Sequence, residues 1–179
     1  MLQKPFLSVV IPVKDENEAT LKRILKGAPK EWEIIVVDDG SKTPCPFATA
    51  RHEKNLGYGA SLKTVLWFAK APIIATMDGD GQHTLHDVSR LFDFVRYLDL
   101  DMGVGDRRLK ETSFKRWAGR KALKWAASFF ALRWIGDLNS GLRIFRKKTA
   151  MGYEPILCNG FSYTTSLTLL MLLDGYKVD

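Results

Sequence analysis

The sequence predicts an α/β fold in which a mostly parallel central sheet is covered by helices on both faces. Short apolar runs alternate with segments whose apolar residues recur at helical spacing, which is the pattern of strands linked by crossover helices. The apolar runs also stop abruptly at proline, glycine or aspartate, as buried strands do where they reach the edge of a sheet. With 179 residues, 46% of them apolar, the chain has enough material for one packed domain.

The first two strands and the helix between them are predicted near the N-terminus. Residues 6–11 form a branched apolar run that stops at Pro12, and residues 34–37 form a second run that stops at two aspartates. Between these runs, residues 16–26 place apolar side chains at helical spacing, with acid at the front and lysine at the back, as the helix dipole favours. This order predicts a strand-helix-strand unit.

The same alternation continues through the middle of the chain. Residues 57–70 and 85–98 are predicted as helices, and residues 73–77 and 102–105 as strands. No repeat of solenoid period and no linker-like stretch interrupts the pattern. We therefore expect a single domain over residues 1–179.

The net charge indicates the kind of partner, and the cysteines indicate the cellular compartment. Lysine and arginine outnumber aspartate and glutamate by 27 to 20, a formal charge of +7, which favours anionic partners such as phosphates, acidic lipid surfaces or nucleic acid. Cys45 and Cys158 fit neither a disulfide framework nor the spacing of a zinc site, which indicates a reducing compartment. The first apolar run is too short for a signal peptide or a membrane span, so we expect a cytoplasmic location.

Acidic and amide side chains gather directly after the strand predicted at residues 73–77. Asp78, Asp80 and Gln82 alternate with glycines there, and the carboxyl ends of parallel strands are where ligands bind in such sheets. Hard oxygen ligands of this kind suit Mg²⁺ or Mn²⁺. The alternative is an acidic turn that caps the next helix. For His83 and His86 a capping or solvated role is favoured over metal ligation.

Six short blocks with distinctive motifs follow one another along the chain. They are residues 9–12 with Glu16, then residues 35–41, 55–60, 78–83, 104–107 and 137–143. Together these blocks resemble the inverting GT-A glycosyltransferases of family 2, most closely the dolichol-phosphate mannose synthase and polyprenyl-phosphate glycosyltransferase group, and the resemblance covers almost the whole chain. It implies a GT-A type nucleotide-sugar-binding fold and a single glycosyltransferase catalytic domain.

The resemblance implies roles for residues on the donor side of the site. Asp78, Asp80 and Gln82 would hold Mg²⁺ or Mn²⁺, and Asp80 would be catalytic because the ion neutralises charge on the departing nucleotide. Lys14 and Asp15 stand where the family commonly has an aromatic residue and an asparagine, so the usual stacking surface for the base is missing at that position. The residues implied in donor binding are Pro12, Glu16, Asp38, Asp39 and Asp78.

On the acceptor side, the resemblance implies a phosphate-binding set in which Arg107 also has a catalytic role. Guanidinium groups suit this task because they bind phosphate through paired hydrogen bonds. Residues 160–166 carry threonines and serines where relatives that glycosylate hydroxyl groups place an acidic base. A phosphate monoester is already anionic and needs no such base, so a phosphate acceptor is favoured, with Asp137 left as a candidate base. The set is Arg107, Arg116, Arg120, Ser140 and Arg143.

A basic amphipathic helix is predicted at about residues 110–133. This segment carries seven basic residues and one acidic residue, and its aromatic and apolar side chains fall on one helical stripe. Such a helix suits the interface of an anionic membrane, which would place the protein at the cytoplasmic face. The alternative is a surface helix that packs its apolar stripe on the sheet.

Together these features predict a metal-dependent inverting glycosyltransferase that moves a sugar from GDP-mannose or a UDP-hexose to a polyprenyl or dolichyl phosphate at the membrane surface. Two alternatives stay open: transfer to a carbohydrate hydroxyl, and a non-catalytic phosphate-binding module. The acidic strand ends argue against nucleic acid as a partner. The chain stops where relatives begin another strand, so both a domain truncated at its C-terminus and a natural minimal form are compatible with the sequence.

Overall fold

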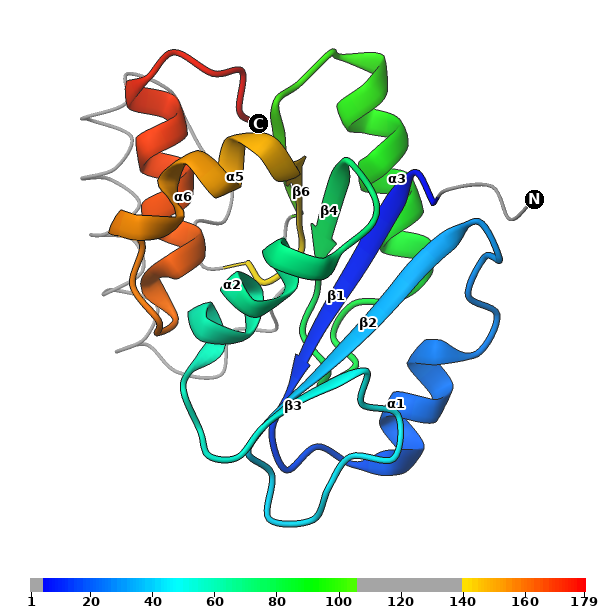
Figure 1. Ribbon diagram of the computed structural model, residues 1–179. Coiled ribbons are helices and arrows are strands. Elements are labelled where there is room, and N and C mark those ends of the chain that lie inside the picture. The colour runs from blue at the N-terminus through cyan, green and yellow to red at the C-terminus, as the bar shows by residue number, and fades with distance from the viewer. Residues whose placement is uncertain (1–4, 106–139) are drawn as a thin grey trace, which may run out of the picture.

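The computed structural model describes residues 5–105 and 140–179, and this part of the chain forms a six-stranded sheet flanked by helices (Figure 1). The strands are β1 (Leu7–Val13), β2 (Trp32–Asp39), β3 (Ala50–His52), β4 (Ile73–Thr76), β5 (Met102–Val104) and β6 (Arg143–Arg146). The helices are α1 (Glu18–Leu25), α2 (Tyr58–Phe68), α3 (Leu85–Tyr97), α5 (Lys147–Tyr153), the 3₁₀ turn η1 (Glu154–Ile156) and α6 (Ser162–Leu173).

The sheet order is β3-β2-β1-β4-β6-β5, and β6 is the strand that runs against its neighbours. Strands β3, β2, β1 and β4 pair in parallel, whereas β6 pairs antiparallel with both β4 and β5. The predicted mostly parallel α/β fold is therefore confirmed. The position of β6 between β4 and β5 was not predicted, because the apolar pattern of a strand does not specify its neighbour or its direction.

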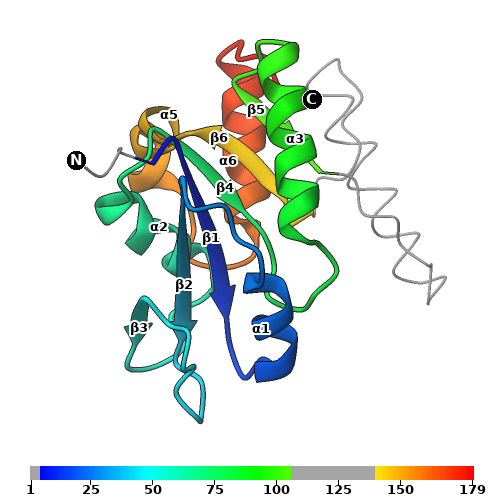
Figure 2. The ribbon, with the colours of Figure 1, turned by 90° about the vertical axis from the view of Figure 1, so that its right-hand side faces the viewer.

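Helices cover both faces of the sheet, as predicted (Figure 2). Along β1, Val9 and Ile11 face one core with side chains of α1 and α3, while Val10 faces the other core with side chains of α2 and α6. This alternation follows from the two-residue period of a strand, so that a strand covered on both faces is apolar throughout. In the described part of the chain, no helix is both long enough and apolar enough to span a bilayer.

Helix boundaries follow local capping chemistry. The side chain of Asn17 accepts hydrogen bonds from the first backbone N–H groups of α1. Thr84 and Asp87 form a capping box at the start of α3, in which each side chain bonds the backbone N–H of the other residue. The three helices predicted in the first hundred residues are confirmed. Helices α5 and α6 were not predicted, and α6 is apolar on most of its circumference, which leaves no helical period to detect.

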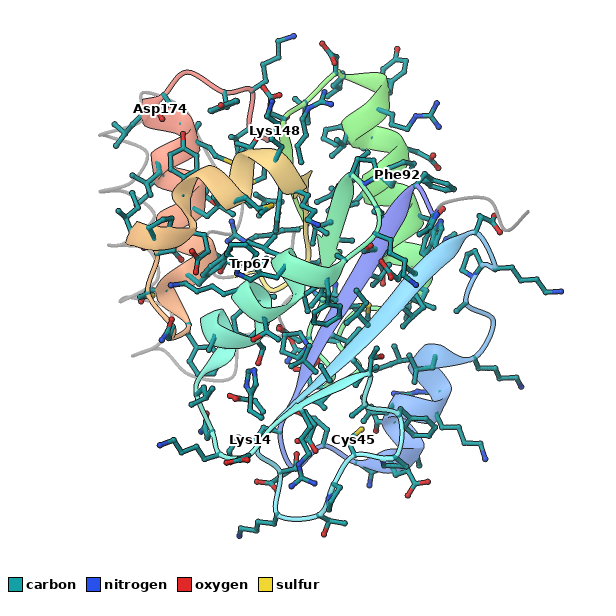
Figure 3. The ribbon with its side chains drawn as sticks, in the orientation of Figure 1. Lys14, Cys45, Trp67, Phe92, Lys148 and Asp174 are labelled. Atoms are coloured by element: carbon teal, nitrogen blue, oxygen red, sulfur yellow. The ribbon has the colours of Figure 1, made fainter. Side chains whose placement is uncertain are left out.

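Because β1, β2 and β4 are parallel, their carboxyl ends meet at one edge of the sheet. Lys14, which follows β1, lies at this edge in Figure 3. The loops that leave these strands carry the acidic residues singled out from the sequence.

Candidate active site

A cavity of about 650 Å³ opens at the carboxyl ends of β1, β2 and β4. This volume lies in the range of small-molecule sites. Five residues predicted for donor or metal binding line it together, and they come from three different strand ends. These are Pro12, Glu16, Asp39, Asp78 and Asp80.

Asp39, at the end of β2, is buried and held by three donors. Its carboxylate accepts hydrogen bonds from the backbone N–H groups of Leu56 and Gly57, each at 2.8 Å, and lies 2.8 Å from Nδ1 of His52. Burial raises the pKa of Asp39, but these hydrogen bonds outweigh it and hold the pKa below its ordinary value. Asp39 is therefore ionised, and its carboxylate holds the turn that leads into α2. The same carboxylate forms an acidic part of the cavity wall.

Replacing Asp39 with asparagine is expected to lower the free energy of unfolding by about 1–3 kcal/mol at pH 7, because a buried charged acceptor loses part of its hydrogen bonding. The folded-state pKa lies below the unfolded value, so this stabilisation is complete above about pH 4 and is lost as the pH falls through the folded-state pKa. Urea unfolding of both proteins at pH 7 and at pH 3 measures it. A difference between the two proteins that stays constant across this range would contradict the assignment.

Asp38, predicted to bind the donor, is not among the residues that line the cavity. Its side chain is fully buried and accepts hydrogen bonds from the backbone N–H groups of Ser41 at 2.8 Å and Cys45 at 3.0 Å. Its carboxylate also lies 3.5 Å from the guanidinium of Arg51. The pattern of two successive aspartates does not show which one faces the ligand. In a strand, neighbouring side chains point to opposite faces.

Asp78, Asp80 and Glu16 give the cavity an acidic floor. The pKa of Glu16 is raised, first by burial and then by the charges of Asp80 and Asp78, so the carboxylate of Glu16 lies close enough to those two carboxylates to be repelled by them. Asp80 accepts a hydrogen bond from the backbone N–H of Gln82 at 2.9 Å, which closes the turn. The side chain of Gln82 is exposed, and Gln82 is not among the residues that line the cavity.

A divalent cation would relieve this repulsion. Within residues 5–105 and 140–179, no three His, Cys, Asp or Glu side chains are gathered closely enough to hold a metal ion by themselves. Mg²⁺ and Mn²⁺, however, are commonly held by one or two carboxylates and complete their shells with water and substrate phosphates. The donor set of Asp78 and Asp80 fits an ion of this kind, shared with a diphosphate.

Gly141, just before β6, packs its backbone directly against the carboxylate of Asp78. A Cβ at this position would overlap both carboxylate oxygens of Asp78. The hydroxyl of Thr76 donates a 2.7 Å hydrogen bond to the carbonyl of Gly141, which ties β6 to the end of β4. The sequence placed Gly141 within the acceptor loop, but its contact with Asp78 depends on the position of β6 and was not predicted.

An aromatic pair also lines the cavity. Tyr58 and Phe161 stack with ring centroids 5.7 Å apart, both line the cavity, and Phe161 is 85% exposed. The backbone at Asn159 holds the pair together, because its carbonyl accepts from the N–H of Ala60 and leaves no room for a Cβ at Gly57. Sequence reasoning missed this pair, whose members are about a hundred residues apart in the chain.

Only two of the residues predicted to bind the acceptor lie in the described part of the chain. Ser140 and Arg143 are fully buried and do not line the cavity; Arg143 donates from Nε to the carbonyl of Ser140 at 3.0 Å and from its guanidinium to the hydroxyl of Thr168. They support the start of β6 where the sequence suggested phosphate contacts. The remaining predicted residues lie outside the described part of the chain: Arg107, Arg116, Arg120, Asp137 and the segment 110–133.

The chain matches a known protein family over most of its length. The model of the family described as glycosyl transferase family 2 matches residues 8–164. Undecaprenyl-phosphate mannosyltransferase of Micrococcus luteus is 27% identical over 194 residues, which cover 94% of this chain and 79% of that protein. Dodecaprenyl-phosphate galacturonate synthase of Rhizobium johnstonii is 28% identical over 164 residues, covering 78% of this chain and 47% of that protein. The chain thus spans about half the length of the second relative.

Solved structures share the fold. A mannosyltransferase from Pyrobaculum calidifontis, in complex with GDP-Man and Mn²⁺, superposes with a TM-score of 0.62 at 16% identity, covering 99% of this chain and 55% of that one. Glucosyl-3-phosphoglycerate synthase of Mycobacterium tuberculosis, in complex with Mn²⁺, UDP-glucose and phosphoglyceric acid, superposes with a TM-score of 0.68 at 17% identity, covering 96% and 66%. These likenesses confirm the predicted GT-A type fold.

Proposed function

Because the chain belongs to glycosyl transferase family 2, we propose that it is the catalytic part of a glycosyltransferase that moves a sugar from a nucleotide-sugar donor to a polyprenyl phosphate. One observation carries the proposal: acidic side chains from the ends of β2 and β4 and from the loop after β1 line a single cavity. A nucleoside diphosphate bridged to a divalent ion is the ligand that such an acidic crevice suits.

The donor would occupy the cavity with its diphosphate at the turn of Asp78 and Asp80. These two carboxylates would hold Mg²⁺ or Mn²⁺, an ion that neutralises charge developing on the departing nucleoside diphosphate. Pro12, Glu16 and Asp39 would surround the nucleoside, and the buried hydrogen bonds of Asp39 keep that wall rigid. GDP-mannose and a UDP-hexose are the two donor types proposed, and the solved relatives hold one of each type.

The acceptor is proposed to be a phosphate. α6 contributes Thr164 to the cavity wall, a hydroxyl rather than the carboxylate that a hydroxyl acceptor would need as a base. A phosphate monoester oxygen attacks the anomeric carbon, the bond from that carbon to the diphosphate oxygen breaks, and the configuration inverts. The protein contributes orientation of the two substrates and charge stabilisation. The curated relatives named for undecaprenyl and dodecaprenyl phosphates support this acceptor class.

A lipid acceptor places the reaction at a membrane surface. The basic segment 110–133 and the arginines at 107, 116 and 120 remain our proposed contacts with the lipid phosphate and the anionic headgroups. In the same proposal, the protein binds peripherally to the cytoplasmic face of the membrane and catalyses the transfer there.

The proposal is tested by incubating the protein with GDP-mannose or UDP-hexoses, Mn²⁺ or Mg²⁺, and undecaprenyl phosphate in detergent. Mass spectrometry of the lipid fraction should detect a glycosyl phosphate, and chelation of the metal should abolish it. Free oligosaccharides serve as competing acceptors in parallel reactions. Sugar transfer to an oligosaccharide hydroxyl, with the lipid phosphate unmodified, would overturn the acceptor assignment and favour the alternative within the family.

A further inference from the structure

A second cavity of about 650 Å³ lies between the C-terminal end of α1 and the N-terminal end of α3. Figure 2 shows these two helix ends close together on the side of the sheet away from α2 and α5. The turn after β4 separates this cavity from the candidate active site. Gly79 and Asp80 line the active site, whereas Gly81 and His83 line the second cavity.

No acidic side chain lines this second cavity, whereas two permanently basic ones do. Arg23 and Lys26 come from the end of α1, and the imidazole of His86 comes from the first turn of α3. Within the described residues, the cations of Arg23 and Lys26 have no carboxylate partner. Asp87 is close by in α3, but its carboxylate is engaged by the backbone N–H and hydroxyl of Thr84 and does not line the cavity. Two cations that pair with no carboxylate of residues 5–105 and 140–179 therefore line an open volume.

His83 adds a polar atom that lacks a partner. The residue is only 5% exposed and lines the second cavity, and within the described residues its Nε2 makes no hydrogen bond. Buried polar atoms are nearly always satisfied by protein, water or a ligand. The Nε2 atom is itself buried, so this unmet hydrogen bond belongs to the wall behind the cavity and does not face a molecule bound in it.

Apolar side chains form part of the remaining wall of the cavity. Trp32, Ile24 and Leu85 line it, and Trp32 is partly buried against the core on this face of the sheet. The volume is in the range of sites for small organic molecules. A ligand that fits this wall carries an apolar or aromatic group next to its anionic group.

We propose that this second cavity binds a small phosphorylated organic molecule. The phosphate would lie between Arg23 and Lys26, because guanidinium and ammonium groups form charge-assisted hydrogen bonds to phosphate oxygens. Its organic part would contact Trp32. The guanidinium of Arg23 packs against Gly81, so the bound phosphate would lie directly behind the turn that carries Asp80. The site is independent of the proposed glycosyl transfer and of its metal ion.

The test uses phenyl phosphate as the probe, without added metal or nucleotide sugar, and NMR titration of the ¹⁵N-labelled protein. Saturable shifts are expected at the backbone amides of Gly27, Gly81 and Ser89, which line the second cavity. The double variant Arg23→Ala, Lys26→Ala should weaken this binding by about tenfold or more, since hydrogen bonds to charged groups contribute about 1.5–3 kcal/mol. Both side chains are exposed, so the fold should be retained.

The matched control is the double variant Lys22→Ala, Lys30→Ala, which removes the same charge from exposed positions that do not line the cavity. Its affinity should stay within about twofold of the unaltered protein. Equal weakening in both double variants would show that general charge attracts the probe and would overturn the proposal. Shifts confined to Gly57 and Gly141 in the candidate active site would overturn it as well. Because no turnover is measured, failure here is distinct from failure of the proposed function.

Discussion

Replacing Asp80 with asparagine is expected to reduce glycosyl transfer by about three orders of magnitude while the protein stays folded, since the loss of several kcal/mol of charge stabilisation corresponds to that change in rate. Asp80 is exposed in the cavity, and its carboxylate, together with that of Asp78, raises the pKa of Glu16. Asparagine keeps the oxygen that accepts from the N–H of Gln82, so the turn persists. It removes the charge that a divalent ion requires.

Asp93→Asn is the matched control for this variant. Asp93 is an exposed residue of α3 that does not line the cavity, and its substitution should leave the rate unchanged. Initial rates at saturating donor and metal, with thermal unfolding measured in parallel, compare the two variants. Near-normal turnover in Asp80→Asn, or turnover that persists after chelation, would remove the proposed metal role.

Gly141→Ala is expected to lower kcat by about a hundredfold, the size of effect that a misplacement of roughly 1 Å in an active site produces. The added methyl group would occupy the space of the Asp78 carboxylate, which must then rotate away or move together with the start of β6. The substitution removes no ionisable group. The rate loss therefore reports the position of Asp78, not its charge.

Gly152→Ala, in α5, is the control for the glycine substitution, because a Cβ at Gly152 meets nothing within 4 Å. It should keep full activity and the same or slightly higher thermal stability, as alanine favours a helix more than glycine does. The expected pattern for Gly141→Ala is a large fall in kcat with a small change in melting temperature. A melting temperature that falls sharply along with the rate would instead indicate a structural role for Gly141.

Strand ends and amphipathic helices could be predicted from the sequence, because both depend on the local pattern of residues. The ends of β1, β2 and β4, at Val13, Asp39 and Thr76, were visible to within two residues as abrupt stops in apolar runs. Parallel pairing brought these ends to one edge, as the α/β pattern required. The helices with one apolar stripe were also found. Family resemblance then assigned roles that the composition alone could not.

What the sequence could not predict depends on long-range packing. Gly141 meets Asp78, and Tyr58 meets Phe161, only because β6 inserts beside β4 and the loop before α6 folds onto α2. Neither contact leaves a periodic signal in the chain. The same holds for Arg143, whose charge suggested a phosphate contact but whose side chain is buried at the start of β6.

In the proposed mechanism, carboxylates at adjacent strand ends bind a divalent ion only together with a nucleoside diphosphate. Isothermal titration of GDP and of UDP, each with and without Mn²⁺, tests it most directly. Because no three-carboxylate metal site exists within the described residues, we predict weak binding of Mn²⁺ alone and at least about tenfold tighter binding of one nucleotide when Mn²⁺ is present. Binding of both nucleotides that is equally strong, or equally absent, with and without the metal would contradict the account.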